Sequence, residues 1–251
     1  MEELSKQQES LLQSLRSRHG RKKHELCLCE GVRSCRELIS SSPELVEFAV
    51  CSADFEAAKW PLSFLKVPPA RFAKLSATIE SQGIILVTRR PCTVWRDIPP
   101  EDPFALVLDR ISDPGNMGTI LRTARAIGLR DIWLTECSAD PFSDKVIRAA
   151  TGAHFALRIR ECGPLPELAA ELRSHGIERF YRTNPHEGVT CFSEKSLFER
   201  SAIILGSEGH GAAELPGSIP LTIPMPGDAE SLNVAQAATI ILFEHVRRQQ
   251  T

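Results

Sequence analysis

The sequence has little of what several common functional classes need. Only 1 of its 251 residues is Tyr and 3 are Trp, so extensive stacking on nucleobases is not indicated. The formal net charge of -2 excludes a basic field over the whole chain. No apolar run approaches the roughly 20 residues of a membrane span, so no membrane partner is predicted. Hydrophobic residues still make up 42%, which is enough for a buried core and argues against long disorder.

We also expect no export signal. The opening MEELSKQQESLLQSL is acidic and polar, which predicts a cytoplasmic location and reduced thiols for the 8 cysteines. Cys27, Cys29 and Cys35 are close enough in sequence for a zinc site. The first two alternate within an expected strand, and neither a second Cys-x-x-Cys nor a paired His accompanies them. Zinc therefore stays an alternative, and we predict no metal.

The chain alternates strand-like and helix-like segments in two blocks. Residues 2–18 have loose helical spacing, and the basic stretch RSRHGRKKH follows at 16–24. The segment RDIPPEDP, with three prolines and no apolar periodicity, is a linker candidate. Strands separated by helices after it predict a parallel sheet. We expect a helical, basic tail at 1–20, a small α/β domain at 21–96, a linker at 97–103 and a second α/β domain at 104–251.

Three strand ends of the second block carry unusual loops, and ligands bind beyond the carboxyl ends of strands in open parallel sheets. The first loop is Asp113-Pro114-Gly115-Asn116, a turn with Asn116 near the N-cap of the next helix. Arg122 lies on that helix, off its apolar stripe. The alternative is a capped surface helix with solvated arginines.

The second loop, LGSEGHGAAEL at 205–215, follows a buried strand. Gly206, Gly209 and Gly211 let backbone groups face a ligand, and Glu208 is the charged residue among them. His210 beside it is an alternative general base. The loop fits neither GxxxxGK[ST] nor GxGxxG, which disfavours a phosphate loop and an NAD-dependent oxidoreductase.

The third loop follows the expected strand LTIPM and ends at a long helix. Ser231 is predicted to cap that helix, which starts near Leu232. Asn233 then falls in the first turn, where its side chain and the helix amides can face a polar ligand. The alternative is an ordinary N-cap.

Together, DPGNMGTILRTA, IILGSEGHGAAEL and LTIPMPGDAESLNVAQAATIILFE resemble the three signature motifs of the SpoU branch of the SPOUT RNA methyltransferases. The resemblance covers about residues 104–247. RKKHELCLCEGVRSCRELI is similar to the start of the ribosomal-protein-like substrate-binding domain found before many SpoU domains. The resemblance implies a C-terminal α/β SPOUT domain with a parallel sheet and a deep trefoil knot, and a homodimer.

The resemblance further implies S-adenosylmethionine (AdoMet)-dependent methylation of a ribose 2′-hydroxyl in RNA. Ribosomal RNA is the preferred substrate and transfer RNA the runner-up. A non-catalytic RNA-binding protein on the same scaffold is an alternative of another class. By the motif match, the catalytic residues are Asn116, Arg122, Glu208, Ser231 and Asn233. The cofactor residues are Thr183, Leu205, Gly206, Ile223, Ser231, Leu232 and Asn233.

The chemistry needs alignment and a nucleophilic oxygen, because a sulfonium is already an activated leaving group. A guanidinium stays protonated in proteins, which disfavours Arg122 as a base. We predict that Arg122 stabilises the developing alkoxide, that Asn116 orients Arg122, and that Glu208 holds the network. Phosphate contacts are predicted at Arg16, Arg18, Arg21, Lys22, Lys23 and Arg33, the alternative being a solvated tail.

Overall fold

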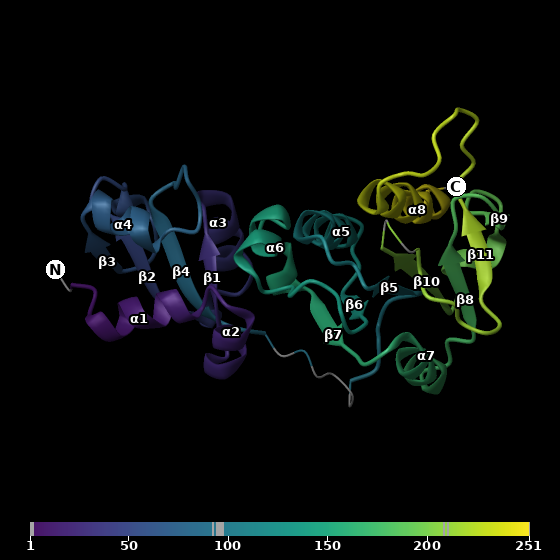
Figure 1. Cartoon of the computed structure of the whole chain (residues 1–251), viewed down its shortest axis with the longest axis horizontal. Coiled ribbons are helices and arrows are strands. Elements are labelled where there is room, and N and C mark those ends of the chain that lie inside the picture. Colours follow the sequence, from purple (N-terminus) through teal and green to yellow (C-terminus); the bar gives the residue numbers. More distant parts are fainter. Residues whose placement is uncertain (1–2, 92, 94–97, 208, 210, 251) are drawn as a thin grey trace. The chain divides into compact units, whose positions relative to one another are not determined.

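The computed structural model describes residues 3–91, 93, 98–207, 209 and 211–250. Its contacts divide the chain into two compact units (Figure 1). Unit 1 comprises Met1–Pro91 and Asp140–Ala156, and unit 2 comprises Cys92–Ala139 and Leu157–Thr251. Within the described residues, no helix is long and apolar enough to cross a membrane.

Unit 1 is built on a four-stranded mixed sheet in the order β1-β4-β2-β3. β4 is antiparallel to both of its neighbours, and β2 is parallel to β3. The sheet and its helices bury an apolar cluster that includes Leu12, Val50, Phe72 and Val87. The elements are α1 (Lys6–Ser14), α2 (Arg18–His24), β1 (Leu26–Glu30), α3 (Val32–Ser41), β2 (Val46–Ser52), β3 (Phe64–Val67), α4 (Pro69–Leu75), β4 (Ile84–Arg89) and α6 (Asp144–Ala149).

Unit 2 contains a parallel sheet in the order β7-β6-β5-β10-β8-β11-β9. The prediction of an α/β domain with a parallel sheet is confirmed. The elements are β5 (Ala105–Asp109), α5 (Pro114–Ala126), β6 (Asp131–Leu134), β7 (Arg158–Glu161), α7 (Leu165–Ser174), β8 (Arg179–Thr183), β9 (Val189–Thr190), β10 (Ser201–Gly206), β11 (Ile219–Thr222) and α8 (Val234–Gln249).

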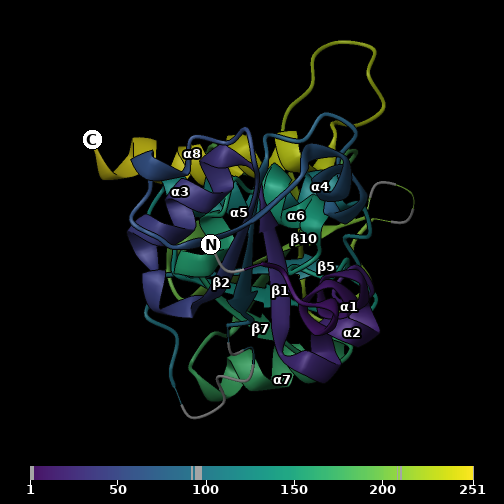
Figure 2. The ribbon, with the colours of Figure 1, turned by 90° about the vertical axis from the view of Figure 1, so that its left-hand side faces the viewer.

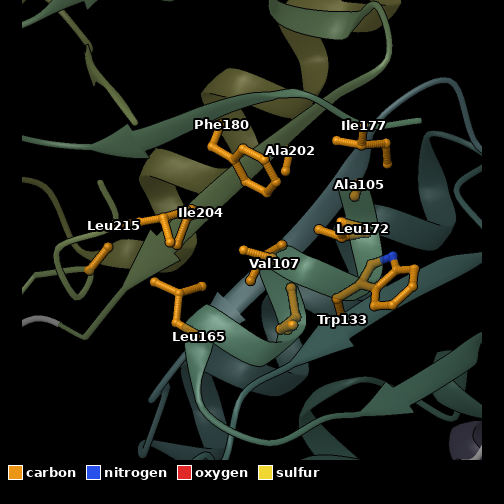
Figure 3. Packing of buried hydrophobic residues seen from close by; sticks show 13 residues of the cluster. Ala105, Val107, Trp133, Leu165, Leu172, Ile177, Phe180, Ala202, Ile204 and Leu215 are labelled. Atoms are coloured by element: carbon orange, nitrogen blue, oxygen red, sulfur yellow. The ribbon is translucent and has the colours of Figure 1, made fainter. Parts of the chain in front are cut away.

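Helices cover both faces of this sheet. Figures 1 and 2 both place α7 and α8 on opposite sides. Side chains of α7 pack with Val107, Trp133, Phe180 and Ile204 of the strands in one buried cluster (Figure 3). α8 packs beside α5, where the hydroxyls of Thr123 and Thr239 lie 3.4 Å apart. Because helices cover both faces of the sheet, both sets of side chains on the central strands are buried, and their sequences are nearly continuous apolar runs.

The segment 140–156 packs with unit 1, although the sequence placed it within the second α/β domain. The Arg21 guanidinium and the Asp140 carboxylate are 2.6 Å apart, with their side chains 5% and 7% exposed. The expected linker is anchored to unit 2 at its far end. The Asp102 carboxylate accepts the Asp131 backbone N–H at 2.7 Å, and Glu101 pairs with Arg158 at 2.7 Å. The remaining boundaries stay predictions.

His154 in unit 1 is fully buried, and within the described residues neither ring nitrogen has a hydrogen-bond partner. Its ring lies 4.1 Å from that of Phe155 and 5.7 Å from that of Phe142. Burial lowers the pKa of His154 from 6.5 to about 3. The folded state therefore binds fewer protons than the unfolded state, and stability is lost as pH falls below 6.5 toward 3.

We expect His154→Leu to remove this acid sensitivity. At pH 5 the wild-type histidine costs about 2 kcal/mol of stability relative to neutral pH, because the unfolded chain gains a proton that the folded chain rejects. Urea unfolding at pH 5 and pH 7.5 should show a smaller loss for the variant. The control is His19→Leu, which replaces an exposed histidine of the same unit. Equal losses in wild type and His154→Leu would contradict the assignment.

Candidate functional site

A cavity of about 320 Å³ opens at the carboxyl ends of β8, β10 and β11. Its volume lies in the range of small-molecule sites, and its position is the one expected for ligands of a parallel sheet. Apolar side chains from three separate chain segments line it together with backbone of the glycine loop. The lining residues are Arg182, Thr183, Asn184, Pro185, His186, Gly206, Ser207, Gly211, Ala212, Leu221, Ile223, Met225, Ser231, Leu232, Val234 and Ala237.

The structure brings most of the predicted cofactor residues to this cavity. Those that line it are Thr183, Gly206, Ile223, Ser231 and Leu232. Leu205 does not line it, because its side chain is fully buried within β10. Asn233 is not a lining residue either, but it directly precedes Val234, which is. Segments about 50 residues apart in sequence thus meet around one space.

Position 206 requires glycine because the protein's own backbone lies too close for a side chain. A Cβ on Gly206 would lie 1.8 Å from the Ala212 nitrogen and 2.0 Å from the Gly211 carbonyl carbon, both backbone atoms. The sequence attributed all three loop glycines to a ligand. At Gly206 the close neighbour is the returning loop, whereas a Cβ on Gly209 or Gly211 meets nothing within 4 Å. Gly211 has φ +64°, a conformation that favours glycine.

Asp109 holds this returning loop and was missed by sequence reasoning. It ends β5, opposite Gly206 in the ladder, and is 1% exposed. One carboxylate oxygen accepts the Ala213 N–H at 2.7 Å, and the other accepts the Thr135 hydroxyl at 2.9 Å. The available signal was an acid at the end of the apolar run FALVLD. A buried carboxylate must be satisfied, so it fixes the loop position.

Two asparagines link the first and third loops. The Asn233 side-chain amide donates to the side-chain oxygen of Asn116 at 2.9 Å. The sequence placed Asn116 near the N-cap of α5. The structure has Asp113 as that cap, and its carboxylate accepts the Asn116 N–H at 2.7 Å. Asn233 caps α8 by accepting the Ala235 N–H at 2.9 Å, so the predicted cap at Ser231 is wrong. The helix starts at Val234 because Asn233 has the better position for the first free amides.

The structure leaves Arg122 outside this group. Arg122 is exposed on α5 and does not line the cavity, and no hydrogen bond joins it to another residue of the described chain. Asn116 therefore does not orient it in this conformation; its side chain bonds Asn233. Glu208 and His210 lie outside the described residues.

Known proteins resemble this chain in sequence and in fold. The sequence profile of the SpoU rRNA Methylase family matches residues 103–243, more than half of the chain. The chain belongs to the SpoU family. A 23S rRNA (guanosine(2553)-2′-O)-methyltransferase from Bacillus subtilis is 39% identical to it over 156 residues, which are 59% of this chain and 61% of that protein.

Solved structures extend the likeness of the SpoU chain beyond the matched segment. A TrmH-family protein from Porphyromonas gingivalis superposes with a TM-score of 0.83 at 30% identity, covering 98% of this chain and 100% of that one. An AdoMet-bound rRNA methyltransferase from Sinorhizobium meliloti has a TM-score of 0.81 at 24% identity, covers 99% and 97%, and supports the fold alone. The SpoU chain spans 65%, 61% and 58% of three curated relatives.

Two arginines of the basic stretch of the SpoU chain make contacts within unit 1. Arg21 is 4% exposed, and its guanidinium binds Asp140 and the carbonyls of Leu15 and Arg16. Arg16 donates to the carbonyls of Lys74 and Ser76. We therefore assign both arginines a structural role in place of the predicted phosphate contacts. The other members of the predicted set, Arg18, Lys22, Lys23 and Arg33, are exposed and remain candidates for phosphate contacts.

The buried cysteines of unit 1 do not form a metal site in the part of the chain that the structure describes. The Cys35 thiol donates to the Cys29 carbonyl at 3.3 Å. Burial raises the pKa of Cys27 to about 12 and raises that of Cys29 well above its ordinary value. The described residues therefore contain no group of ligands arranged for the zinc alternative.

A second cavity of about 630 Å³ lies in unit 1, and sequence reasoning missed it. The rings of Phe55 and Trp60, 5.7 Å apart, take part in lining it. The Arg36 guanidinium lies 5.5 Å from the Trp60 ring centre. Lys59, Asp54 and Glu56 also line this space, so two basic side chains, Arg36 and Lys59, balance two acidic ones.

Proposed function

We propose that this chain transfers a methyl group from AdoMet to a ribose 2′-hydroxyl of RNA, with ribosomal RNA as the substrate. The observation that carries the proposal is the cavity at the strand ends, which the second and third motif segments line at Gly206, Ile223 and Leu232 within the range that the SpoU family profile matches. Ribose methylation of 23S rRNA by the Bacillus subtilis relative supports the choice of RNA. The 2′-hydroxyl itself distinguishes RNA from DNA.

The residues present fit AdoMet. Leu221, Ile223, Met225 and Leu232 offer apolar surface for an adenosyl group, and the loop at Gly211 offers open backbone groups. When bound, AdoMet supplies an activated methyl group on a sulfonium. The chain has to hold the ligands in line and to exclude water around the reacting oxygen.

We assign the stabilisation of the alkoxide to Arg122. Its planar fork can donate two hydrogen bonds to the sugar oxygen and an adjacent phosphate, while water or phosphate accepts the proton. Asn116 and Asn233 position the start of α8, which borders the cavity. Glu208 and Ser231 complete the proposed set.

We also propose a homodimer, a deep trefoil knot in the C-terminal domain and a cytoplasmic location. The dimer is supported by the position of Arg122 outside the cavity of its own chain and by Phe243, which is 49% exposed on α8. The knot is what the resemblance of the motifs to the SpoU family implies. RNA contacts are assigned to Arg18, Lys22, Lys23 and Arg33.

The proposal is tested by incubating the purified protein with methyl-labelled AdoMet and either 23S rRNA or total tRNA, followed by mapping of 2′-O-methyl positions. We expect one labelled ribose in rRNA. Label in tRNA alone would establish the runner-up substrate. AdoMet binding without label would instead support an RNA-binding protein on a methyltransferase scaffold.

A further inference from the structure

Arg182 is an unexplained charge in the proposed cofactor cavity. It precedes the last residue of β8 and lines the cavity beside Thr183. Its Nε atom is buried and has no hydrogen-bond partner in the described chain. Because successive side chains of a strand point to opposite faces, Arg182 and Thr183 approach the space from different sides.

None of the described lining residues neutralises this charge. The described lining residues with ionisable side chains are Arg182 and His186, and none of them is acidic. Leaving a buried donor of a charged group without an acceptor is costly. A guanidinium has five N–H donors and accepts nothing, so the missing partner is an acceptor, and an anion satisfies it best.

We propose that Arg182 binds the carboxylate of the methionine moiety of AdoMet. This inference rests on the proposed function, which makes AdoMet the ligand. The carboxylate is the one anionic group of AdoMet, whereas its sulfonium and ammonium groups are cations that a guanidinium repels. Arg182 therefore orients AdoMet by holding its carboxylate, so that the sulfonium lies away from the guanidinium.

The matched probe is decarboxylated AdoMet, which keeps the adenosyl, sulfonium and amine groups and lacks the carboxylate. Calorimetry on the full chain should show that wild type binds AdoMet about 10- to 100-fold more tightly than this probe, as a charge-assisted hydrogen bond predicts. Arg182→Met should bind the two ligands within about 3-fold of each other. Arg182→Lys should retain part of the preference, since it keeps the charge and loses the fork.

The control is Arg179→Met, an exposed arginine at the other end of β8, which should behave as wild type. Equal affinity of wild type for both ligands would overturn the inference without any variant. An equal loss of both ligands in Arg182→Met would also overturn it, because Arg182 would then contact the adenosyl group. Wild type that binds neither ligand would refute the proposed cofactor, and the inference with it.

Discussion

Replacing Arg122 with alanine is expected to lower kcat by about 10²- to 10³-fold, the usual loss when one transition-state donor is removed. AdoMet affinity should stay near wild type, because Arg122 does not line the cavity. The charge on the ribose oxygen develops only in the transition state, so the loss should appear in kcat rather than in binding. Single-turnover methylation and calorimetry on the same preparations measure the two quantities.

Arg122→Lys separates charge from geometry. If the planar fork is required, lysine restores little of the activity, because an ammonium cannot bridge the sugar oxygen and a phosphate in the same way. Near-wild-type activity in Arg122→Lys would show that the planar guanidinium is not required. A pH–rate profile of the lysine variant tests whether the side chain itself accepts the proton: a new basic limb would favour that role. Arg179→Ala is the control.

Gly206→Ala is expected to destabilise the fold by about 3 kcal/mol or more and to abolish AdoMet binding, because the added methyl overlaps backbone that cannot move aside alone. The overlap is with Ala212, the residue before the one that Asp109 holds. Either β10 shifts from its neighbours or the loop leaves the cavity. Urea unfolding gives the stability, and calorimetry gives the affinity.

Gly209→Ala is the matched control in the same loop. Its Cβ meets nothing within 4 Å, so stability should change by less than about 0.5 kcal/mol. A Gly206→Ala protein with wild-type stability and affinity would show that the loop yields to the methyl group. A large loss in Gly209→Ala would instead mean that the whole loop, rather than one crossing point, demands glycine.

Local patterns predicted the larger features well. The buried run Ala202-Ile203-Ile204 became the central part of β10, and the periodic segment after Asn233 became α8. The family also followed from sequence, because three short motifs in a fixed order are specific even when each is ambiguous. The details of capping were less predictable. Asp113, Asn116, Ser231 and Asn233 are all good cap residues, and the choice depends on backbone angles that distant packing sets.

The side-chain partners of single charges were the least predictable. Arg21 has the same sequence signature as its exposed neighbours Lys22 and Lys23, yet a carboxylate 119 residues away binds it. Asp109 and Arg182 likewise gained their importance from contacts or a cavity that no local pattern contains. The parts of the second loop that carry Glu208 and His210 stay predictions.

By itself, the sequence predicted most of the strands and helices, the loops that end the strands, and the family, because hydrophobic periodicity and motif spacing are properties of neighbouring residues. Only the tertiary structure decided which of those loops share a cavity, why Gly206 has no side chain, and which arginines are left for a ligand. Those outcomes depend on contacts between segments that are distant in sequence. Atoms of one segment determine whether another has room for a methyl group or a partner for a buried charge.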